Sequence, residues 1–181
     1  MKLVRSNRRT LSLEIKAGEG VIVRAPLHAS KEEINNFINS HKDWIEKHLK
    51  KMQERKSALA SVNKLSMEEI KALAEKALFV IPERVKYYAE KLNVSYGRIT
   101  IRNQKTRWGS CSKRKNLNFN CLLMLTPPDV MDSVIIHELC HLKEMNHSER
   151  FYAEVLSVFP DYWRCHRWLK ENGAEIMARL P

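Results

Sequence analysis

Two histidines and a glutamate stand at a spacing that is typical of zinc enzymes. His137, Glu138 and His141 form the pattern H-E-x-x-H, and on a helix the two histidines lie one turn apart on the same face. Two imidazoles at that spacing can bind one zinc ion, while the neighbouring glutamate can take a proton from a water that the metal activates. The sequence therefore predicts a hydrolytic zinc site with Glu138 as its general base.

A catalytic zinc site needs a third protein ligand besides its water. We predict His147, because the five residues between it and His141 match the ligand spacing of the H-E-x-x-H-x-x-G-x-x-H metalloproteases. The glycine of that pattern is replaced here by Glu144, so the turn after the helix must be built differently. Glu154 and His166 are the competing candidates for the third ligand.

The residues before and around the motif predict a buried helix. Thr126 can cap the helix N-terminus, Pro127 suits the first helical position, and the helix carries the apolar residues Val130, Val134, Ile135, Ile136 and Leu139. Buried histidines need partners for their ring nitrogens, and a metal supplies them. The alternative is a pair of core histidines bonded to backbone carbonyls.

Candidates for substrate contact lie on both sides of this helix. The pair Trp108-Gly109 indicates a tight turn or bulge, and alternation of Leu117, Phe119 and Cys121 predicts a strand that could hold an extended peptide. The side chains that we single out for substrate contact are Arg107, Trp108, Lys143, Arg150 and His166. All of these except Trp108 are also candidates for stabilising an oxyanion. A structural alternative is that Trp108 belongs to the core and that Arg107 holds a loop.

The rest of the chain predicts a hairpin followed by long helices. Alternating residues within 11–25 indicate a β-hairpin, and S-x-x-E capping boxes at Ser30 and Ser66 begin two amphipathic helices, the first reaching Met52. Pro82 is expected to interrupt the second. Asp161 can cap a last helix that stops near Gly173. We divide the chain into residues 1–65, hairpin plus helix, and residues 66–181, the catalytic domain, together forming one compact unit.

Charge and cysteine usage limit the class of protein. The net charge is +11, and residues 100–125 hold six Lys/Arg and no Asp/Glu. Such a basic surface attracts anions, including nucleic acid, nucleotides and acidic peptides, although a solvated surface without a partner also explains it. No apolar run approaches the ~20 residues of a membrane span. The four cysteines form no C-x-x-C pair, which favours a reduced, cytoplasmic compartment, while the lack of a long apolar run predicts no membrane partner.

Several segments resemble one known family. KTRWGSCS at 105–112, NLNFN at 116–120 and HELCHLKEMNH at 137–147 are similar to the YgjP-like metallopeptidase domain family, which is related to the SprT and WLM zinc peptidases. RRTLSL, WIEKHL and PDYWRCHRWLKENG, at 8–13, 44–49 and 160–173, also fit. The resemblance implies an α+β, zincin-like fold with a small antiparallel or mixed sheet packed on helices. It also implies zinc on His137, His141 and His147, with Glu138 as the catalyst.

Three hypotheses for the function follow. The first is a cytoplasmic zinc metallopeptidase acting on a peptide or protein. The second is a phosphohydrolase that cleaves nucleoside triphosphates with magnesium or another divalent ion, since a triphosphate needs Lys/Arg clamps such as the basic block 100–125 offers. The third is a SprT-type protein that associates with nucleic acid through its basic surface, which rests on charge alone.

Overall fold

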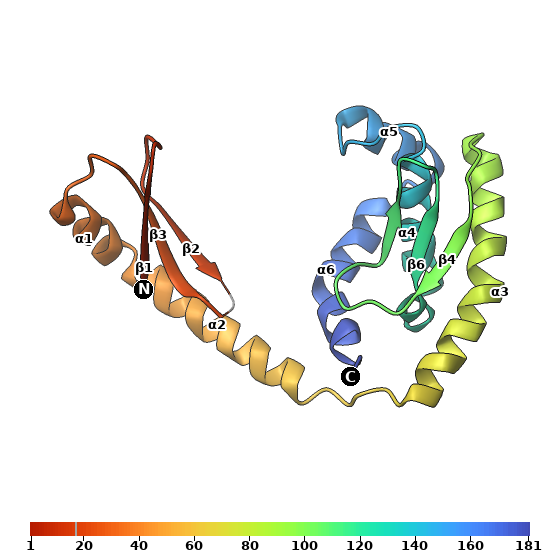
Figure 1. Cartoon of the computed structure of the whole chain (residues 1–181), viewed down its shortest axis with the longest axis horizontal. Coiled ribbons are helices and arrows are strands. Elements are labelled where there is room, and N and C mark those ends of the chain that lie inside the picture. The colour runs from red at the N-terminus through yellow and green to blue at the C-terminus, as the bar shows by residue number, and fades with distance from the viewer. Residues whose placement is uncertain (17) are drawn as a thin grey trace. The chain divides into compact units, whose positions relative to one another are not determined.

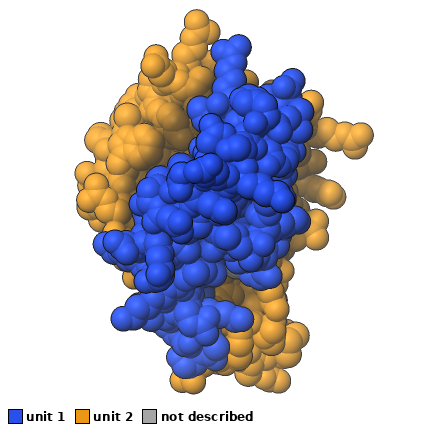
Figure 2. All heavy atoms as spheres, turned by 90° about the vertical axis from the view of Figure 1, so that its left-hand side faces the viewer, with its two compact units in different colours: residues 1–61 blue, residues 62–181 orange. Residues whose placement is uncertain are grey.

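The chain is built of helices and small mixed sheets, so the predicted α+β class is confirmed. The computed structural model describes residues 1–16 and 18–181, which form two compact units, residues 1–61 and residues 62–181. Figure 2 colours the two units separately. Within the described residues, no helix combines the length and the apolar character needed to cross a bilayer.

The first unit is a three-stranded sheet with two helices (Figure 1). Its strands β1 (Lys2–Ser6), β2 (Ser12–Lys16) and β3 (Gly20–Pro26) lie in the order β1-β3-β2, with β1 parallel and β2 antiparallel to β3. The predicted hairpin is therefore confirmed, and β1 adds a strand that has no alternating pattern. In the hairpin turn, Gly18 and Gly20 have positive φ angles of 83° and 74°, a conformation that glycine adopts readily. Ala17 lies outside the described residues.

The predicted single helix from Ser30 to Met52 is wrong, because the chain forms two helices, α1 (Lys31–Ser40) and α2 (Lys42–Ala60). The capping box at Ser30 and Glu33 is present. At His41 the backbone leaves the helical region with φ −112° and ψ 14°. Ser40 Oγ donates to the Phe37 carbonyl at 2.9 Å, and such local side-chain bonds compete with the backbone ladder of a helix.

The second unit packs long helices on a second three-stranded sheet (Figure 1). The sheet has the order β4-β6-β5, with β4 parallel and β5 antiparallel to β6. Its elements are α3 (Met67–Leu92), β4 (Ile99–Arg102), β5 (Gly109–Cys111), β6 (Leu117–Asn120), the 3₁₀ helix η1 (Cys121–Leu125), α4 (Pro128–Cys140), α5 (Glu149–Val158) and α6 (Tyr162–Ala178).

Helix α4 is the centre of this unit. Its buried residues pack between those of α3, β6 and α5 in one hydrophobic core, which includes Val85, Phe119, Ile135, Leu139 and Phe151. A helix that is apolar on almost every side is buried by its neighbours, and ten of the thirteen residues of α4 are buried. The core therefore fixes the position of the helix that carries the H-E-x-x-H motif.

Five sequence expectations about this unit are wrong. Pro82 lies inside α3 without ending it, and residues 109–111 form strand β5 instead of a turn or bulge. Helix α4 begins at Pro128 with no side-chain cap, because Thr126 Oγ1 donates to the Leu123 carbonyl at 2.8 Å and closes η1 instead. Helix α6 runs past Gly173 to Ala178, and Asp161 makes no side-chain cap.

Solvent exposure explains one of these differences, and tertiary packing explains another. Proline at position 82 leaves the Leu78 carbonyl without its helical donor, but Leu78 is exposed, so water can serve that carbonyl. Gly173 is buried against Trp108, and a Cβ there would lie 3.2 Å from Trp108 Cζ2. Gly173 thus allows close packing within the helix instead of ending it.

Candidate metal centre

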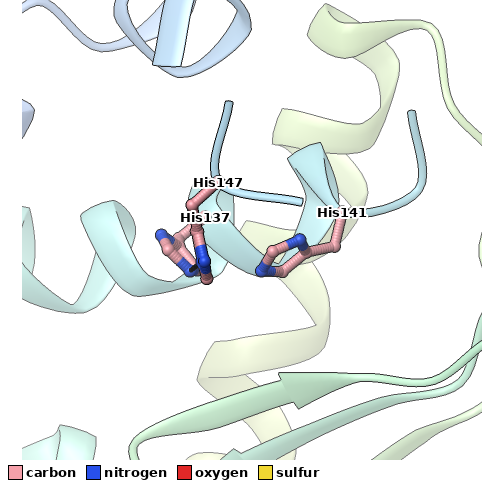
Figure 3. Close-up of side chains that lie close together, drawn as sticks. All are labelled: His137, His141 and His147. Carbon is pink, nitrogen blue, oxygen red and sulfur yellow. Dashed lines mark hydrogen bonds between the residues drawn. The ribbon is translucent and has the colours of Figure 1, made fainter. Parts of the chain in front are cut away.

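The three predicted ligand histidines converge in the structure. His137 and His141 come from the last turn of α4 and its end, and His147 comes from the segment before α5 (Figure 3). One ring nitrogen of each lies within 4.8 Å of the corresponding atoms of the other two. The Nε2 atoms of His137 and His147 are 3.0 Å apart. This is the spacing at which a single ion could be shared by three imidazoles.

The Phe151 ring packs against all three histidine rings. It is fully buried in α5, and its ring centroid lies 4.9 Å, 4.6 Å and 4.9 Å from those of His137, His141 and His147. Ser148 accepts from the Phe151 backbone N–H at 3.3 Å, which caps α5 immediately after the last histidine. The segment after α4 therefore delivers both His147 and the side chain that packs against the triad.

The ring nitrogens that point away from the triad have partners of their own. His137 Nδ1 lies 2.8 Å from the Tyr162 hydroxyl, and His141 Nδ1 lies 3.2 Å from the Glu144 carbonyl oxygen. A carbonyl can only accept, so the proton of His141 is on Nδ1 and its Nε2 lone pair is free. In zinc sites such outer contacts fix the tautomer of the ligand, and three nitrogen ligands suit zinc. The donor set therefore fits a zinc ion.

Burial keeps His137 neutral. Burial lowers the pKa of His137 to about 3, and the neighbouring histidines act in the same direction. The pKa of His141 is also lowered, again mainly by burial. A metal binds the neutral form of imidazole, so both side chains are in the protonation state that a metal requires.

Glu138 lies at the junction of α4 and the edge of the sheet. Its side chain is buried, and a Cβ at position 109 would lie 2.7 Å from both its Cγ and its Oε1 atom. Glycine in β5 is therefore what allows this strand to approach the carboxylate. Burial raises the pKa of Glu138 to about 8, against the opposite effects of Arg107 and a backbone hydrogen bond from Cys111. A carboxylate with such a pKa is suited to proton transfer near neutral pH.

A small pocket opens beside Glu138. It has a volume of about 210 Å³ and is bounded by the start of β5, by α4 and by α6. Its lining residues are Trp108, Gly109, Ser133, Val134, His137, Glu138, Tyr162, His166 and Leu169. A pocket next to a candidate general base is the place where part of a substrate would bind.

The other residues that the sequence singled out are spread around this centre. Trp108 and His166 line the pocket, and Arg107 is close enough to Glu138 to influence its pKa. Lys143 donates to Glu154 at 2.6 Å, so this competing ligand is paired with a lysine. Arg150 is exposed in the first turn of α5. The geometry thus brings Trp108, His166 and Arg107 to the centre and leaves Lys143 and Glu154 as an ion pair beside it.

Two contributors were missed by sequence reasoning, Tyr162 and Asn120. Asn120 is fully buried, and its amide donates to the carbonyls of Gln104 and Arg107 at 2.6 Å and 3.0 Å. It therefore holds the loop that carries Arg107 and Trp108. Tyr162 approaches His137 from 25 positions away in the chain, so no local pattern connects the two. The available signals were its place next to Asp161, which was expected to cap the helix, and its place in the segment 160–173 that resembles the family.

Tyr162→Phe is expected to weaken zinc binding by about tenfold, because contacts to the outer nitrogen of a ligand histidine typically contribute 10–100-fold to metal affinity. The measurement is the zinc dissociation constant from competition with a chromophoric chelator. Tyr152→Phe is the matched control, since its ring lies in the same aromatic cluster, and no described hydrogen bond joins its hydroxyl to a ligand histidine. Equal affinity in the two variants would contradict the role of Tyr162.

The stability of the metal-free protein should depend on pH through Glu138 and His137 in opposite directions. The pKa of Glu138 is raised from 4.5 to about 8 on folding, so the folded chain holds an extra proton between these values and gains stability as the pH falls. The pKa of His137 is lowered from 6.5 to about 3, so the unfolded chain holds the extra proton and stability is lost as the pH falls through that range.

We therefore expect the free energy of unfolding to increase from pH 8 to pH 6.5, by at most about 1.4 kcal/mol per pH unit. Between pH 6.5 and pH 4.5 the two contributions offset each other. Urea unfolding of chelator-treated protein measures this, and Glu138→Gln should remove the alkaline slope. A slope that persists in the variant would show that another group causes it.

Two solved structures are similar to part of this chain. Crystal structures of the metallopeptidase zymogens of Pyrococcus abyssi abylysin and Methanocaldococcus jannaschii jannalysin are similar at 23% and 24% identity, each with a TM-score of 0.46. Each match covers 51% of this chain, and 94% and 95% of the respective structures. A search of curated proteins gives no match.

A family model provides the assignment. The model of the YgjP-like metallopeptidase domain matches residues 9–76 and 60–172, which together span most of the chain and include the three histidines and Glu138. The chain therefore belongs to the YgjP-like, metallopeptidase domain family.

Proposed function

We propose that this chain is a zinc-dependent peptidase that uses Glu138 as its general base. The observation that carries the proposal is the convergence of three histidine nitrogens within 4.8 Å, next to a buried carboxylate with a raised pKa. His137, His141 and His147 would hold the ion, which supplies a Lewis acid for the scissile carbonyl and acidifies the attacking water. Membership of a metallopeptidase family supports this chemistry over other uses of a zinc ion.

Glu138 would move one proton during hydrolysis. Its carboxylate accepts a proton from the attacking water as the oxygen bonds to the carbonyl carbon, and then gives that proton to the leaving nitrogen as the C–N bond breaks. Gly109 and Cys111 hold the carboxylate from the β5 side. His166 lines the pocket and Arg107 influences Glu138, so these two exposed residues are our candidates for stabilising the oxyanion.

Strand β5 offers a short edge for an extended substrate. In an antiparallel pair, residues that bond to the partner strand alternate with residues that do not. The Trp108 carbonyl accepts from the Asn120 N–H at 2.8 Å, and the Ser112 N–H donates to the Asn116 carbonyl at 2.9 Å. Gly109 and Cys111 therefore direct their backbone groups away from β6. Because the Cys111 amide serves Glu138, we propose that a peptide pairs with Gly109 alone. The strand expected from the sequence to hold the peptide, at residues 117–121, is wrong for this role, because β6 is paired with β4 on one side and with β5 on the other.

The nucleotide hypothesis has less support at the pocket. A triphosphate needs several cationic clamps, whereas the nine residues that line the pocket include no Lys or Arg. Arg107 is the one basic residue of block 100–125 that is seen to influence the centre. Lys113, Arg114 and Lys115 are exposed in the turn between β5 and β6. These charges remain the reason to test nucleotides and nucleic acid beside peptides.

One assay panel tests the proposal. The full chain, loaded with zinc or supplied with magnesium, is offered casein-derived peptides, a set of nucleoside triphosphates and duplex DNA, in parallel with Glu138→Gln. Zinc-dependent peptide cleavage that the variant loses would support the peptidase. Release of pyrophosphate or phosphate without peptide cleavage would replace it with a phosphohydrolase. DNA binding with a steep salt dependence and no hydrolysis would favour the nucleic-acid hypothesis.

A further inference from the structure

We infer that the pocket bounded by Trp108, Val134 and Leu169 is a specificity pocket that takes one compact apolar side chain of the substrate, next to the bond that is cleaved. The inference rests on the proposed peptidase function and names the class of residue that the enzyme prefers. It follows from where the pocket lies, how large it is and what lines it.

The pocket lies next to the position where the scissile bond would be. His137 and Glu138 form part of its wall, so a substrate whose carbonyl reaches the histidine triad has a neighbouring side chain at the pocket mouth. Gly109, from the edge of β5, forms another part of the wall. A peptide lying along Gly109 would therefore direct a side chain that flanks the scissile bond into this space.

The size suits a single side chain. The volume of about 210 Å³ is below the roughly 300–1,000 Å³ of pockets that hold drug-sized ligands. One wall is held at a fixed distance, because the Trp108 indole packs against Gly173 of α6, where a Cβ would lie 3.3 Å from its Nε1 atom. Asn120 holds the Trp108 loop, because its side-chain amide donates to the Arg107 carbonyl and its backbone N–H donates to the Trp108 carbonyl. The pocket is therefore bounded by supported side chains.

The chemistry of the walls favours an apolar side chain over a charged one. Trp108, Val134 and Leu169 are apolar, and the Ser133 hydroxyl already donates to the Val130 carbonyl at 2.7 Å. Among the nine lining residues Glu138 is the sole carboxylate, and no lysine or arginine is present. A charged Asp or Lys side chain would lose hydration against these apolar walls, whereas an aliphatic side chain would gain from leaving water.

The first experiment measures cleavage preference. The zinc-loaded full chain is given fluorogenic peptides that differ only at the residues before and after the scissile bond, which are Gly, Ala, Leu, Phe, Asp or Lys, and mass spectrometry locates each cut. At one of the two positions we expect kcat/KM for Leu to exceed that for Asp or Lys by about 100-fold. A flat ranking at both positions would overturn the inference.

A matched pair of variants tests whether this pocket is the cause. Leu169→Ala enlarges the pocket and should shift the preference from Leu toward Phe. Leu156→Ala makes the same change at a partly buried residue of α5 that packs on the same core but does not line the pocket, and it should keep the wild-type ranking. Identical rankings in the two variants would overturn the assignment to this pocket.

A second measurement does not depend on cleavage. Saturation-transfer NMR with N-acetyl-leucinamide should detect binding to the full chain, and the same experiment with N-acetyl-aspartamide should not. Leu169→Trp fills the pocket and should abolish the leucinamide signal. If no peptide is cleaved, the proposed function fails while this measurement still decides the pocket. If leucinamide does not bind, or binds Leu169→Trp equally well, the pocket inference fails whatever the activity.

Discussion

Glu138→Gln is expected to lower kcat/KM for peptide hydrolysis by about 10²–10⁴-fold, the range that general acid–base groups contribute. Glutamine matches the shape of glutamate, so its contacts with Gly109 and Cys111 can be retained. It cannot accept a proton from water, so the loss concerns the chemical step. The fall should appear in kcat and kcat/KM together, because the missing interaction belongs to the transition state.

The control for this variant is a carboxylate that lies outside the centre. Glu149 is exposed in the first turn of α5, two residues after His147, and Glu149→Gln should keep its activity. Both variants should still bind one zinc ion, as measured by metal analysis. Full activity in Glu138→Gln would exclude this carboxylate as the base, whereas loss of zinc from it would mean that the activity reports on the metal site instead.

Arg84→Met is expected to destabilise the protein by about 3 kcal/mol, because it leaves a buried carboxylate without its counter-charge. Asp132 of α4 is buried, and Arg84 Nε donates to its Oδ1 at 2.7 Å while Nη2 donates to Oδ2. The Tyr88 hydroxyl donates to the same Oδ2 at 2.9 Å. This cluster joins α3 to the helix that carries the metal ligands. The free energy of unfolding in urea measures the effect.

A second substitution separates the buried charge from general disruption. Arg84→Met/Asp132→Leu removes both charges, so it should be less destabilised than Arg84→Met alone, since no carboxylate is then left buried without a counter-charge. The Tyr88 hydroxyl then loses its acceptor, which limits the recovery. If the double variant is as unstable as the sum of the two single variants, the pair contributes no coupling and this explanation is wrong.

Local patterns were sufficient to predict the centre of the site. The helical spacing of His137 and His141, and the short offset to His147, are set within eleven consecutive residues, so chain geometry alone brings these side chains close together. The hairpin and both capping boxes are equally local, and all three are present.

Contacts between distant segments could not be predicted. Tyr162 reaches His137 from another helix, and Arg84 pairs with Asp132 across 48 positions, so neither pair leaves a periodic signal. Pro82 and Gly173 were misread for a related reason. Both usually end helices, yet the helix continues through each of them, because water can serve the carbonyl that Pro82 leaves without a donor and Gly173 packs against Trp108. At these positions the environment outweighs intrinsic propensity.

The central claim is that three imidazoles hold one zinc ion beside Glu138, and X-ray absorption at the zinc K-edge tests it most directly. For the zinc-loaded protein we expect one ion per chain and three imidazole nitrogens at about 2.0–2.1 Å, with a further light-atom ligand from solvent. His147→Ala should reduce the imidazole count by one. Sulfur scattering at about 2.3 Å, which would indicate a cysteine such as Cys140 or Cys111, or the absence of stoichiometric zinc, would contradict the account.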